Sequence, residues 1–134
     1  MTDDASAPRP PAEFDSIDVL YVDDAIVVVD KPSGLSVHRG DDQSSTFALN
    51  LTRDAIGHWV YPVHRLDRPT SGVLVFALSS DHARTLQTAF EERRIDKRYL
   101  ALVRGRPPEE GLIDSPMEKR EGGPDVEAAT EFRR

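Results

Sequence analysis

Short apolar runs alternate with polar breaks through the first third of the chain, a pattern typical of β-strands. Residues 17–22 are mainly apolar, the pair Asp23-Asp24 follows them, and the β-branched run 25–29 comes next. Two such runs around a polar pair predict a hairpin or two sequential strands. The Lys-Pro-Ser-Gly sequence at residues 31–34 then predicts a turn, because its proline cannot donate a ladder hydrogen bond and its glycine can adopt positive φ.

Two later stretches have the apolar spacing of amphipathic helices. We expect the first to begin after an N-cap serine, Ser44 or Ser45, and to end at Gly57. We expect the second to follow an N-cap within residues 79–81. Their apolar faces comprise Phe47, Leu51 and Ala55 in the first helix, and Ala83, Leu86, Ala89 and Phe90 in the second.

The remaining apolar runs predict further strands. One covers residues 73–78, another covers 99–103 before a Gly-Arg-Pro-Pro stop, and short strands are expected near 112–113 and 128–132. Strands with two interspersed helices predict an α+β domain over residues 17–134, with a mixed, mainly antiparallel sheet. Residues 1–16 are acidic and rich in proline, so we expect them to form a disordered leader.

Composition narrows the class of protein. The chain has 134 residues, enough for one domain with a real core. Cysteine is absent, which excludes disulfides and thiolate metal sites and fits a cytoplasmic protein. No apolar run is long enough to span a membrane, and the acidic start is unlike a signal peptide. The four histidines show no metal-ligand spacing, so we expect no metal site.

Charge is distributed unevenly along the chain. The net charge is −7 overall, with −7 in residues 1–52, +4 in residues 53–106 and −4 in residues 107–134. Arginine outnumbers lysine 14 to 3, and its guanidinium suits bidentate phosphate contacts and base stacking. The distribution therefore predicts a localised basic face, so the overall negative charge does not exclude an anionic partner.

The most informative stretch lies inside this positive segment. Residues 64–72 read His-Arg-Leu-Asp-Arg-Pro-Thr-Ser-Gly, between the apolar segments 59–63 and 73–78. A polar loop between two apolar segments is a usual place for binding and catalytic side chains. The simpler interpretation is a charged surface loop in which Asp67 pairs with Arg65 or Arg68, a kind of ion pair that contributes little stability.

This loop resembles the signature His-Arg-Leu-Asp-x-x-Thr-Ser-Gly of the RluA-type pseudouridine synthases, enzymes that isomerise uridine in RNA. With Arg-Pro as the variable pair, it is most similar to the tRNA pseudouridine synthase C branch. Residues 30–38 resemble the family's earlier Lys-Pro-x-Gly segment, and residues 97–105 resemble its later Lys-x-Tyr segment. The three motifs occur in the family's order and span roughly residues 17–106.

The resemblance implies the N-terminal half of a pseudouridine synthase catalytic domain. We therefore expect a partner of structured RNA, either tRNA or rRNA, and a cytoplasmic monomer at full length. Conversion of uridine to pseudouridine breaks the C1′–N1 bond and joins C1′ to C5 without exchanging electrons, so no cofactor is expected. A stacked base is out of reach and has to be flipped out of the helix first.

Individual roles follow from the same resemblance. Asp67 matches the catalytic carboxylate, which can attack the ribose or the base, or stabilise positive charge on the ribose. Tyr99 matches the family's catalytic aromatic residue, which stacks on the flipped uracil and can act in the proton transfer at C5. The residues expected to contact RNA are His64, Arg65, Arg68, Lys31, Lys97 and Arg98, with Arg65 as a candidate wedge or phosphate clamp.

Simpler interpretations stay open at several of these positions. Residue 64 can be a satisfied loop histidine, residues 31 and 97 solvated lysines, and residue 99 a strand tyrosine with a hydrogen-bonded hydroxyl. The whole chain can also be a non-catalytic RNA-binding remnant. A hydrolase with Asp67 as nucleophile is a further alternative, but no paired acid is evident.

Members of the resembled family are substantially longer than this chain. They continue into a segment rich in Arg, His and Gly, which supplies a basic partner for the catalytic Asp. The sequence has no counterpart of that segment before Arg134. We therefore expect an incomplete, C-terminally truncated catalytic domain that shows little or no turnover by itself.

Overall fold

The computed structural model describes residues 14–40, 46–118 and 122–134. The chain divides into two compact units, with unit 1 formed by residues 1–96 and unit 2 by residues 97–134. The expectation of one domain over residues 17–134 stays a prediction. Residues 1–13 of the expected leader lie outside the described part, whereas Phe14 packs against the core of unit 1. The packed core thus reaches into the segment predicted as leader.

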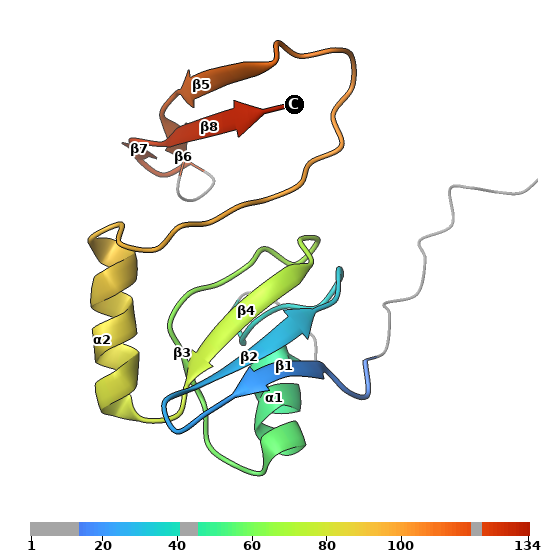
Figure 1. The fold of residues 1–134 in the computed structure, drawn as a ribbon, viewed down its shortest axis with the longest axis vertical. Coiled ribbons are helices and arrows are strands. Elements are labelled where there is room, and N and C mark those ends of the chain that lie inside the picture. Colours follow the sequence, from blue (N-terminus) through green and yellow to red (C-terminus); the bar gives the residue numbers. More distant parts are fainter. Residues whose placement is uncertain (1–13, 41–45, 119–121) are drawn as a thin grey trace, which may run out of the picture. The chain divides into compact units, whose positions relative to one another are not determined.

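A four-stranded antiparallel sheet in the order β1-β2-β4-β3 forms the centre of unit 1 (Figure 1). The strands are β1 (Asp18–Val22), β2 (Ile26–Lys31), β3 (Tyr61–Pro62) and β4 (Gly72–Ala77). The predicted hairpin is confirmed as β1 and β2, and the strand predicted at 73–78 is confirmed as β4. Every pairing among the described strands is antiparallel.

The turn between β1 and β2 is held by the Asp23 carboxylate. Its Oδ1 accepts hydrogen bonds from the backbone N–H groups of Ala25 at 2.8 Å and Ile26 at 2.9 Å. Its Oδ2 accepts a hydrogen bond from the Tyr21 hydroxyl at 2.9 Å. These donors, with the backbone pair first, lower the pKa of Asp23 below its ordinary value. The polar pair seen in the sequence is therefore a turn closed by a side chain.

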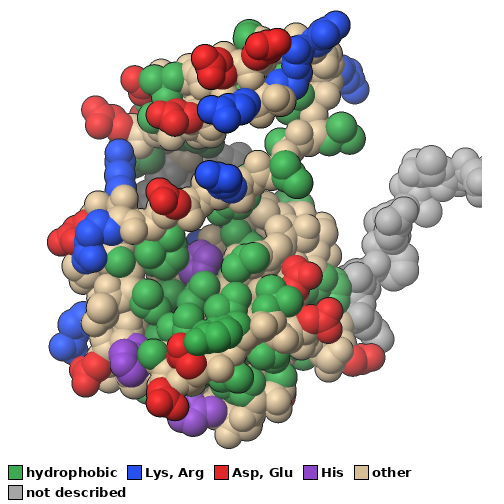
Figure 2. Space-filling view, viewed as in Figure 1, with side chains coloured by type: hydrophobic (Ala, Val, Ile, Leu, Met, Phe, Trp, Pro, Cys, Tyr) green, Lys and Arg blue, Asp and Glu red, His purple; other side chains and the backbone are tan. Residues whose placement is uncertain are grey.

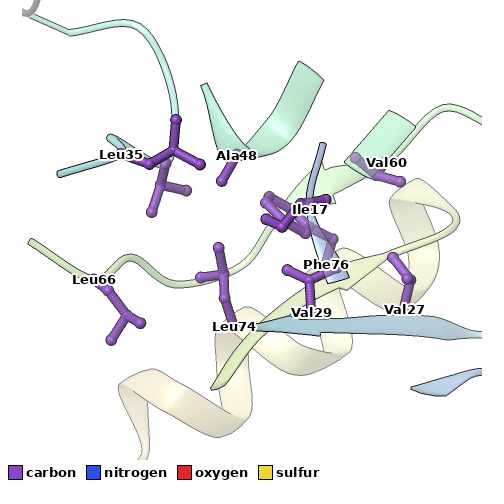
Figure 3. Close-up of a cluster of buried hydrophobic side chains, with 10 residues drawn as sticks. Ile17, Val27, Val29, Leu35, Ala48, Val60, Leu66, Leu74 and Phe76 are labelled. Atoms are coloured by element: carbon purple, nitrogen blue, oxygen red, sulfur yellow. The ribbon is translucent and has the colours of Figure 1, made fainter. Parts of the chain in front are cut away.

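Strand residues alternate between two faces of the sheet, and a different helix packs on each face. The main core joins Val27 and Val29 of β2 and Leu74 and Phe76 of β4 to Ala48 of α1 (Ala48–Ile56) (Figure 3). Val75 and Ala77 alternate with these residues and pack instead with α2 (Ser80–Glu91). β4 therefore contributes apolar side chains to both clusters.

Part of the sheet surface is uncovered. Figure 2 shows hydrophobic side chains gathered over the face of β1, β2 and β4 that is turned towards the viewer. Tyr21 is 52% exposed and Val73 is 62% exposed. Unit 1 therefore combines a buried apolar core with an exposed apolar surface on its sheet.

The helix α1 begins later than predicted. Its N-cap is Phe47, whose side chain makes no capping hydrogen bond, so the prediction of a serine cap was wrong. The first backbone N–H groups of α1 are satisfied from a distant loop, because Ala48 donates to the Ser36 carbonyl and Leu49 to the Val37 carbonyl, each at 2.9 Å. Ser44 and Ser45 lie outside the described residues.

The C-terminal end of α1 and the start of α2 follow local rules. Gly57 ends α1 with φ of 64°, as predicted, in a conformation that glycine adopts without a Cβ penalty. Ser79 caps α2, and its Oγ accepts a hydrogen bond from the His82 backbone N–H at 3.1 Å. The predicted apolar face of α2 is confirmed, since Ala83, Leu86 and Phe90 belong to the cluster with Val75 and Ala77.

Unit 2 consists of two nested antiparallel pairs. The outer pair is β5 (Glu110–Asp114) with β8 (Ala129–Arg133), and the inner pair is β6 (Met117–Glu118) with β7 (Asp125–Val126). Both strands expected late in the chain are thereby confirmed. A Cβ on Gly111 would lie 2.6 Å from the Phe132 ring, so a larger residue there would require this ring to move.

The strand predicted at 99–103 is absent from the described structure, and that prediction was wrong. An apolar run forms a strand only when a neighbouring strand takes up its N–H and C=O groups. None of the described strands pairs with these residues. Leu100 and Leu102 accordingly have fully exposed side chains.

The α+β class with two helices and a mainly antiparallel sheet is confirmed by the described residues. None of the helices found in them is long and apolar enough to cross a membrane. The same residues contain no group of His, Asp and Glu side chains suited to hold a metal ion.

Candidate active site

Two loops meet at one end of the sheet of unit 1. The Lys31 loop (residues 31–35) continues from β2, and the Asp67 loop (residues 63–71) leads into β4. Since β2 and β4 run antiparallel with Lys31 opposite Gly72, the two loops lie at the same end of this strand pair. The sequence motifs around residues 31 and 67 are therefore neighbours in space.

Reciprocal hydrogen bonds join the two loops. The Gly34 backbone N–H donates to the Arg68 carbonyl at 2.7 Å, and Arg68 Nε donates to the Gly34 carbonyl at 3.0 Å. Ser33 Oγ donates to the Pro69 carbonyl at 2.7 Å. Gly34 has φ of 94°, so the turn that presents its N–H and C=O to Arg68 favours glycine. The Asp67 loop is thus fixed by side chains and backbone of the Lys31 loop.

Lys31 lies in the interior beneath this junction. Its side chain is fully buried, and Nζ donates to the carbonyls of Pro32 at 2.9 Å, Leu35 at 2.6 Å and Arg68 at 3.1 Å. Three acceptors use the three donors of an ammonium group. The structure therefore contradicts the expected RNA contact and the solvated charge at this position, because no N–H of Lys31 is left to face a phosphate or bulk water.

Two opposing effects act on the Lys31 ammonium. Burial lowers the pKa of Lys31 below its ordinary value, and the nearby Asp67 carboxylate raises it. Burial is the larger effect. The buried lysine and the exposed aspartate are thus electrostatically linked, even though no direct ion pair joins them among the described residues.

Asp67 itself is displayed on the surface of the loop. Its side chain is exposed, and its backbone carbonyl accepts a hydrogen bond from the Thr70 N–H at 2.9 Å. None of the ion pairs between described residues includes Asp67, so the simpler interpretation of a pair with Arg65 or Arg68 is not supported. The carboxylate is therefore accessible while the backbone beneath it is held by a turn.

Leu66 explains how the loop holds this orientation. Its side chain is 5% exposed and belongs to the main core, between the exposed residues Arg65 and Asp67. Burying a leucine stabilises by about 2 kcal/mol, which is comparable with the entropic cost of ordering one loop residue. Because Leu66 points into the core, its two neighbours Arg65 and Asp67 both point to the surface. No role was predicted for Leu66 from the sequence, although an apolar residue between two charged ones is a signal for it.

The predicted site residues fall into three groups. Asp67, Arg65 and Arg68 lie together on the Asp67 loop with exposed side chains. His64 is half-buried, and its ring stacks on Phe90 with centroids 4.6 Å apart, so the interpretation as a satisfied histidine is favoured over a direct RNA contact. Lys97, Arg98 and Tyr99 are exposed residues of unit 2, and their approach to Asp67 stays a prediction.

The family model for RNA pseudouridylate synthase matches residues 25–133, most of the chain. The chain belongs to this family. The match spans the Lys31 loop, the Asp67 loop and the segment around Tyr99, and it confirms the resemblance inferred from the three motifs. It covers both compact units of the structure.

Several curated relatives are named tRNA pseudouridine synthase C. The tRNA pseudouridine synthase C of Haemophilus ducreyi is 48% identical over 103 residues, 75% of this chain and 42% of the relative. The protein of the same name from Yersinia pestis is 50% identical over 103 residues, 75% of this chain and 40% of the relative. The chain therefore spans well under half the length of these relatives.

Solved structures support the fold. Human RNA Pseudouridylate Synthase Domain Containing 4 is 30% identical and superimposes with a TM-score of 0.64 over 85% of this chain and 50% of that chain. Human RNA Pseudouridylate Synthase Domain Containing 1 is 24% identical, with a TM-score of 0.71 over 92% of this chain and 54% of that chain. The second likeness concerns the fold alone.

Proposed function

We propose that this protein, at its full natural length, isomerises a specific uridine in RNA to pseudouridine, with Asp67 as the catalytic carboxylate. The observation that carries the proposal is the placement of Asp67. It is exposed at the tip of a loop that a second family motif fixes through four hydrogen bonds, from Gly34, Arg68, Ser33 and Lys31. A catalytic group needs this kind of rigid support.

The reaction suits a lone carboxylate. The C1′–N1 bond breaks, the uracil turns, C1′ joins C5, and the hydrogen on C5 is replaced while N1 gains one, so atoms and electrons balance without a cofactor. An ionised Asp67 can bond to the ribose or the base and leave again, or stabilise positive charge on the ribose. Its exposure leaves the carboxylate free to meet a flipped nucleotide.

The RNA contacts follow from the surface around Asp67. Arg65 and Arg68 are exposed on the same loop and suit phosphate contacts or insertion into the vacated stack. By the family resemblance, Lys97 and Arg98 would also contact the RNA, with the Tyr99 ring stacked on the uracil. Lys31 is omitted, because its ammonium is buried.

Substrate and setting are proposed from the relatives. The names of the curated relatives favour tRNA over rRNA. We propose a cytoplasmic enzyme that acts as a monomer and needs no metal or cofactor. Binding by a basic face predicts that the affinity for a tRNA stem-loop falls steeply with added salt, because bound counterions are released. A flat salt response would contradict the electrostatic contribution of residues 53–106.

Tritium release from RNA labelled at C5 of uridine tests the proposal. In the full-length protein, Asp67→Asn should abolish release while RNA affinity stays within about twofold, because the amide keeps the shape but not the nucleophile. Arg65→Ala should weaken RNA binding instead. Asp54→Asn on α1 is the matched control, since it makes the same chemical change at an exposed carboxylate outside the Asp67 loop.

Each alternative gives a different result. Robust tritium release by Asp67→Asn would show that Asp67 is not the catalytic carboxylate. RNA binding without release by the unaltered full-length protein would favour a non-catalytic RNA-binding protein. Free uracil without pseudouridine would favour a hydrolase. The 134 residues alone should show little or no release, and full turnover by them would show that these residues suffice.

A further inference from the structure

The edge of β4 that faces β3 is only partly paired with backbone. β3 pairs with β4 at Tyr61 opposite Ala77 and Pro62 opposite Phe76, and the strand pairing ends there. Val75 lies two residues before Ala77, so its N–H points to the same edge. This N–H donates to Nε2 of His64 at 3.0 Å. An imidazole nitrogen thus accepts the hydrogen bond that a strand carbonyl would otherwise accept.

The His64 ring is held on a second side by α2. It stacks on the Phe90 ring with centroids 4.6 Å apart and an angle of 15° between the planes. One ring therefore connects the edge of β4 to the last turn of α2, and both contacts restrict its position. Because a backbone N–H can only donate, Nε2 must carry a lone pair, so His64 is neutral with its proton on Nδ1.

This arrangement changes the path of the chain. Continued by one residue, the register of β3 with β4 would place Val63 opposite Val75, and a hydrogen bond from the Val75 N–H to the Val63 carbonyl would extend β3 past Pro62. The imidazole instead fills the space between the residue 64 backbone and Val75. From Arg65 onward the chain leaves the sheet, buries Leu66 and displays Asp67 three residues after the ring.

We propose that His64 is a positioning residue for Asp67: its ring replaces a strand carbonyl on Val75, ends β3, and fixes where the Asp67 loop leaves the sheet. The proposal rests on the proposed function for its consequence in catalysis. Its structural part stands on the two ring contacts alone. His64 then acts through the backbone of the loop rather than by touching RNA.

Three substitutions in the full-length protein separate the contacts. His64→Gln supplies an acceptor oxygen for Val75 without the stack, and His64→Phe keeps a stack on Phe90 without an acceptor. His58→Phe is the matched control, because His58 is exposed and contacts only the backbone of its neighbour in the described structure. Tritium release should fall by about 10- to 100-fold in His64→Phe with RNA affinity nearly unchanged, since small misplacements of a reacting group have such effects. Release should recover substantially in His64→Gln and stay normal in His58→Phe.

Nuclear magnetic resonance tests the structural part separately. The ¹⁵N shifts of the imidazole should report a proton on Nδ1 and none on Nε2. Amide signals of residues 65–71 should move in His64→Phe and stay close to wild type in His64→Gln. A protonated Nε2, or loop signals unmoved in His64→Phe, would overturn the proposal. Equal loss of release in the Gln and Phe variants would also overturn it, because the acceptor would then not matter. If the unaltered protein forms no pseudouridine, the proposed function fails, and the loop signals still decide the role of His64.

Discussion

The two units use similar residues in opposite ways. Leu74 and Phe76 in unit 1 are fully buried, whereas Leu100 and Leu102 in unit 2 are fully exposed, and none of the described residues of unit 2 is buried. Both units contain antiparallel strand pairs. Strand pairing therefore occurs with a core in unit 1 and without one in unit 2.

This difference separates two sources of stability. A backbone hydrogen bond formed on folding replaces one made to water, so its net contribution is small. Removal of apolar side chains from water supplies most of the favourable free energy of folding. Isolated two-stranded hairpins, which lack such burial, are only marginally stable. We therefore expect unit 1 to hold most of the stability of the 134 residues, and five experiments test this expectation.

Hydrogen exchange should give the largest contrast. Amides of β2 should exchange several thousandfold more slowly than amides of β5 once intrinsic rates are removed. The estimate takes about 5 kcal/mol for global opening of unit 1 and near zero for local opening of unit 2. Exchange monitored by nuclear magnetic resonance measures both strands in one sample. Similar protection in β2 and β5 would show that unit 2 has a core of its own.

A matched pair of phenylalanines tests the same contrast by substitution. Phe76→Ala should lower the free energy of unfolding by about 3–5 kcal/mol, because Phe76 is fully buried and a cavity remains. Phe132→Ala should cost under about 1 kcal/mol, since Phe132 is only half-buried in a two-stranded pair. Urea unfolding followed by circular dichroism measures both variants. A larger loss in Phe132→Ala would reverse the ranking of the two units.

A buried and an exposed lysine, Lys31 and Lys97, compare the two units in the same way. Lys31→Met should destabilise by about 2 kcal/mol, because three carbonyls lose a charged donor inside the protein. Lys97→Met should change stability by less than about 0.5 kcal/mol, since Lys97 is exposed. Equal effects in the same urea experiment would mean that the hydrogen bonds of Lys31 contribute nothing.

The Lys31 pair also predicts a pH dependence. Since burial lowers the pKa of Lys31 in the folded state, the unfolded chain holds this proton between the lowered value and the ordinary value of 10.5. The unfolding free energy of the wild type relative to Lys31→Met should therefore rise as pH increases through that window. Urea titrations of both proteins at a series of alkaline pH values measure the difference. A falling difference would mean that the Asp67 charge outweighs burial.

The smallest expected effect is a gain in stability. Thr52 is fully buried in α1, and its Oγ1 has no hydrogen-bond partner in the described structure. Thr52→Val should raise the unfolding free energy by about 1 kcal/mol, because it removes an unsatisfied hydroxyl at nearly constant volume. Thr130→Val on the exposed strand β8 should change it by less than about 0.5 kcal/mol. Thermal unfolding measures both variants. A lower unfolding free energy in Thr52→Val would indicate that the hydroxyl has a hydrogen-bond partner after all.

Local chemistry allowed part of the fold to be predicted. The β1–β2 hairpin, the Ser79 cap and the Gly57 end depend on residues within a few positions of each other, and all were predicted. The start of α1 was not, because its first N–H groups bond to Ser36 and Val37 in another loop. A run such as 99–103 has the composition of a strand, but pairing depends on a partner that composition does not reveal.

The candidate site also has a part that local sequence predicts and a part that depends on residues far apart in the chain. The motif identified Asp67 and its neighbours, since a signature of nine residues is local information. The support beneath the motif comes from bonds such as Ser33 to Pro69, which are 36 residues apart. Lys31 was misread because a lysine is usually solvated, and only the three carbonyls around it show that this one is structural.

The order of the strands in the sheet has a consequence during synthesis. β2 pairs with β4, and the partner of Lys31 is Gly72, roughly 40 residues further along the chain. At about 5–20 residues per second, the ribosome takes roughly 2–8 s to supply that partner. For this interval the run Ile26-Val27-Val28-Val29 has an open edge that can pair with another nascent chain. The carboxylates of Asp23, Asp24 and Asp30 border the run, and like charges on two such chains would repel each other. Asp23, which closes a turn in the finished protein, thereby also helps to protect its central strand before the fold exists.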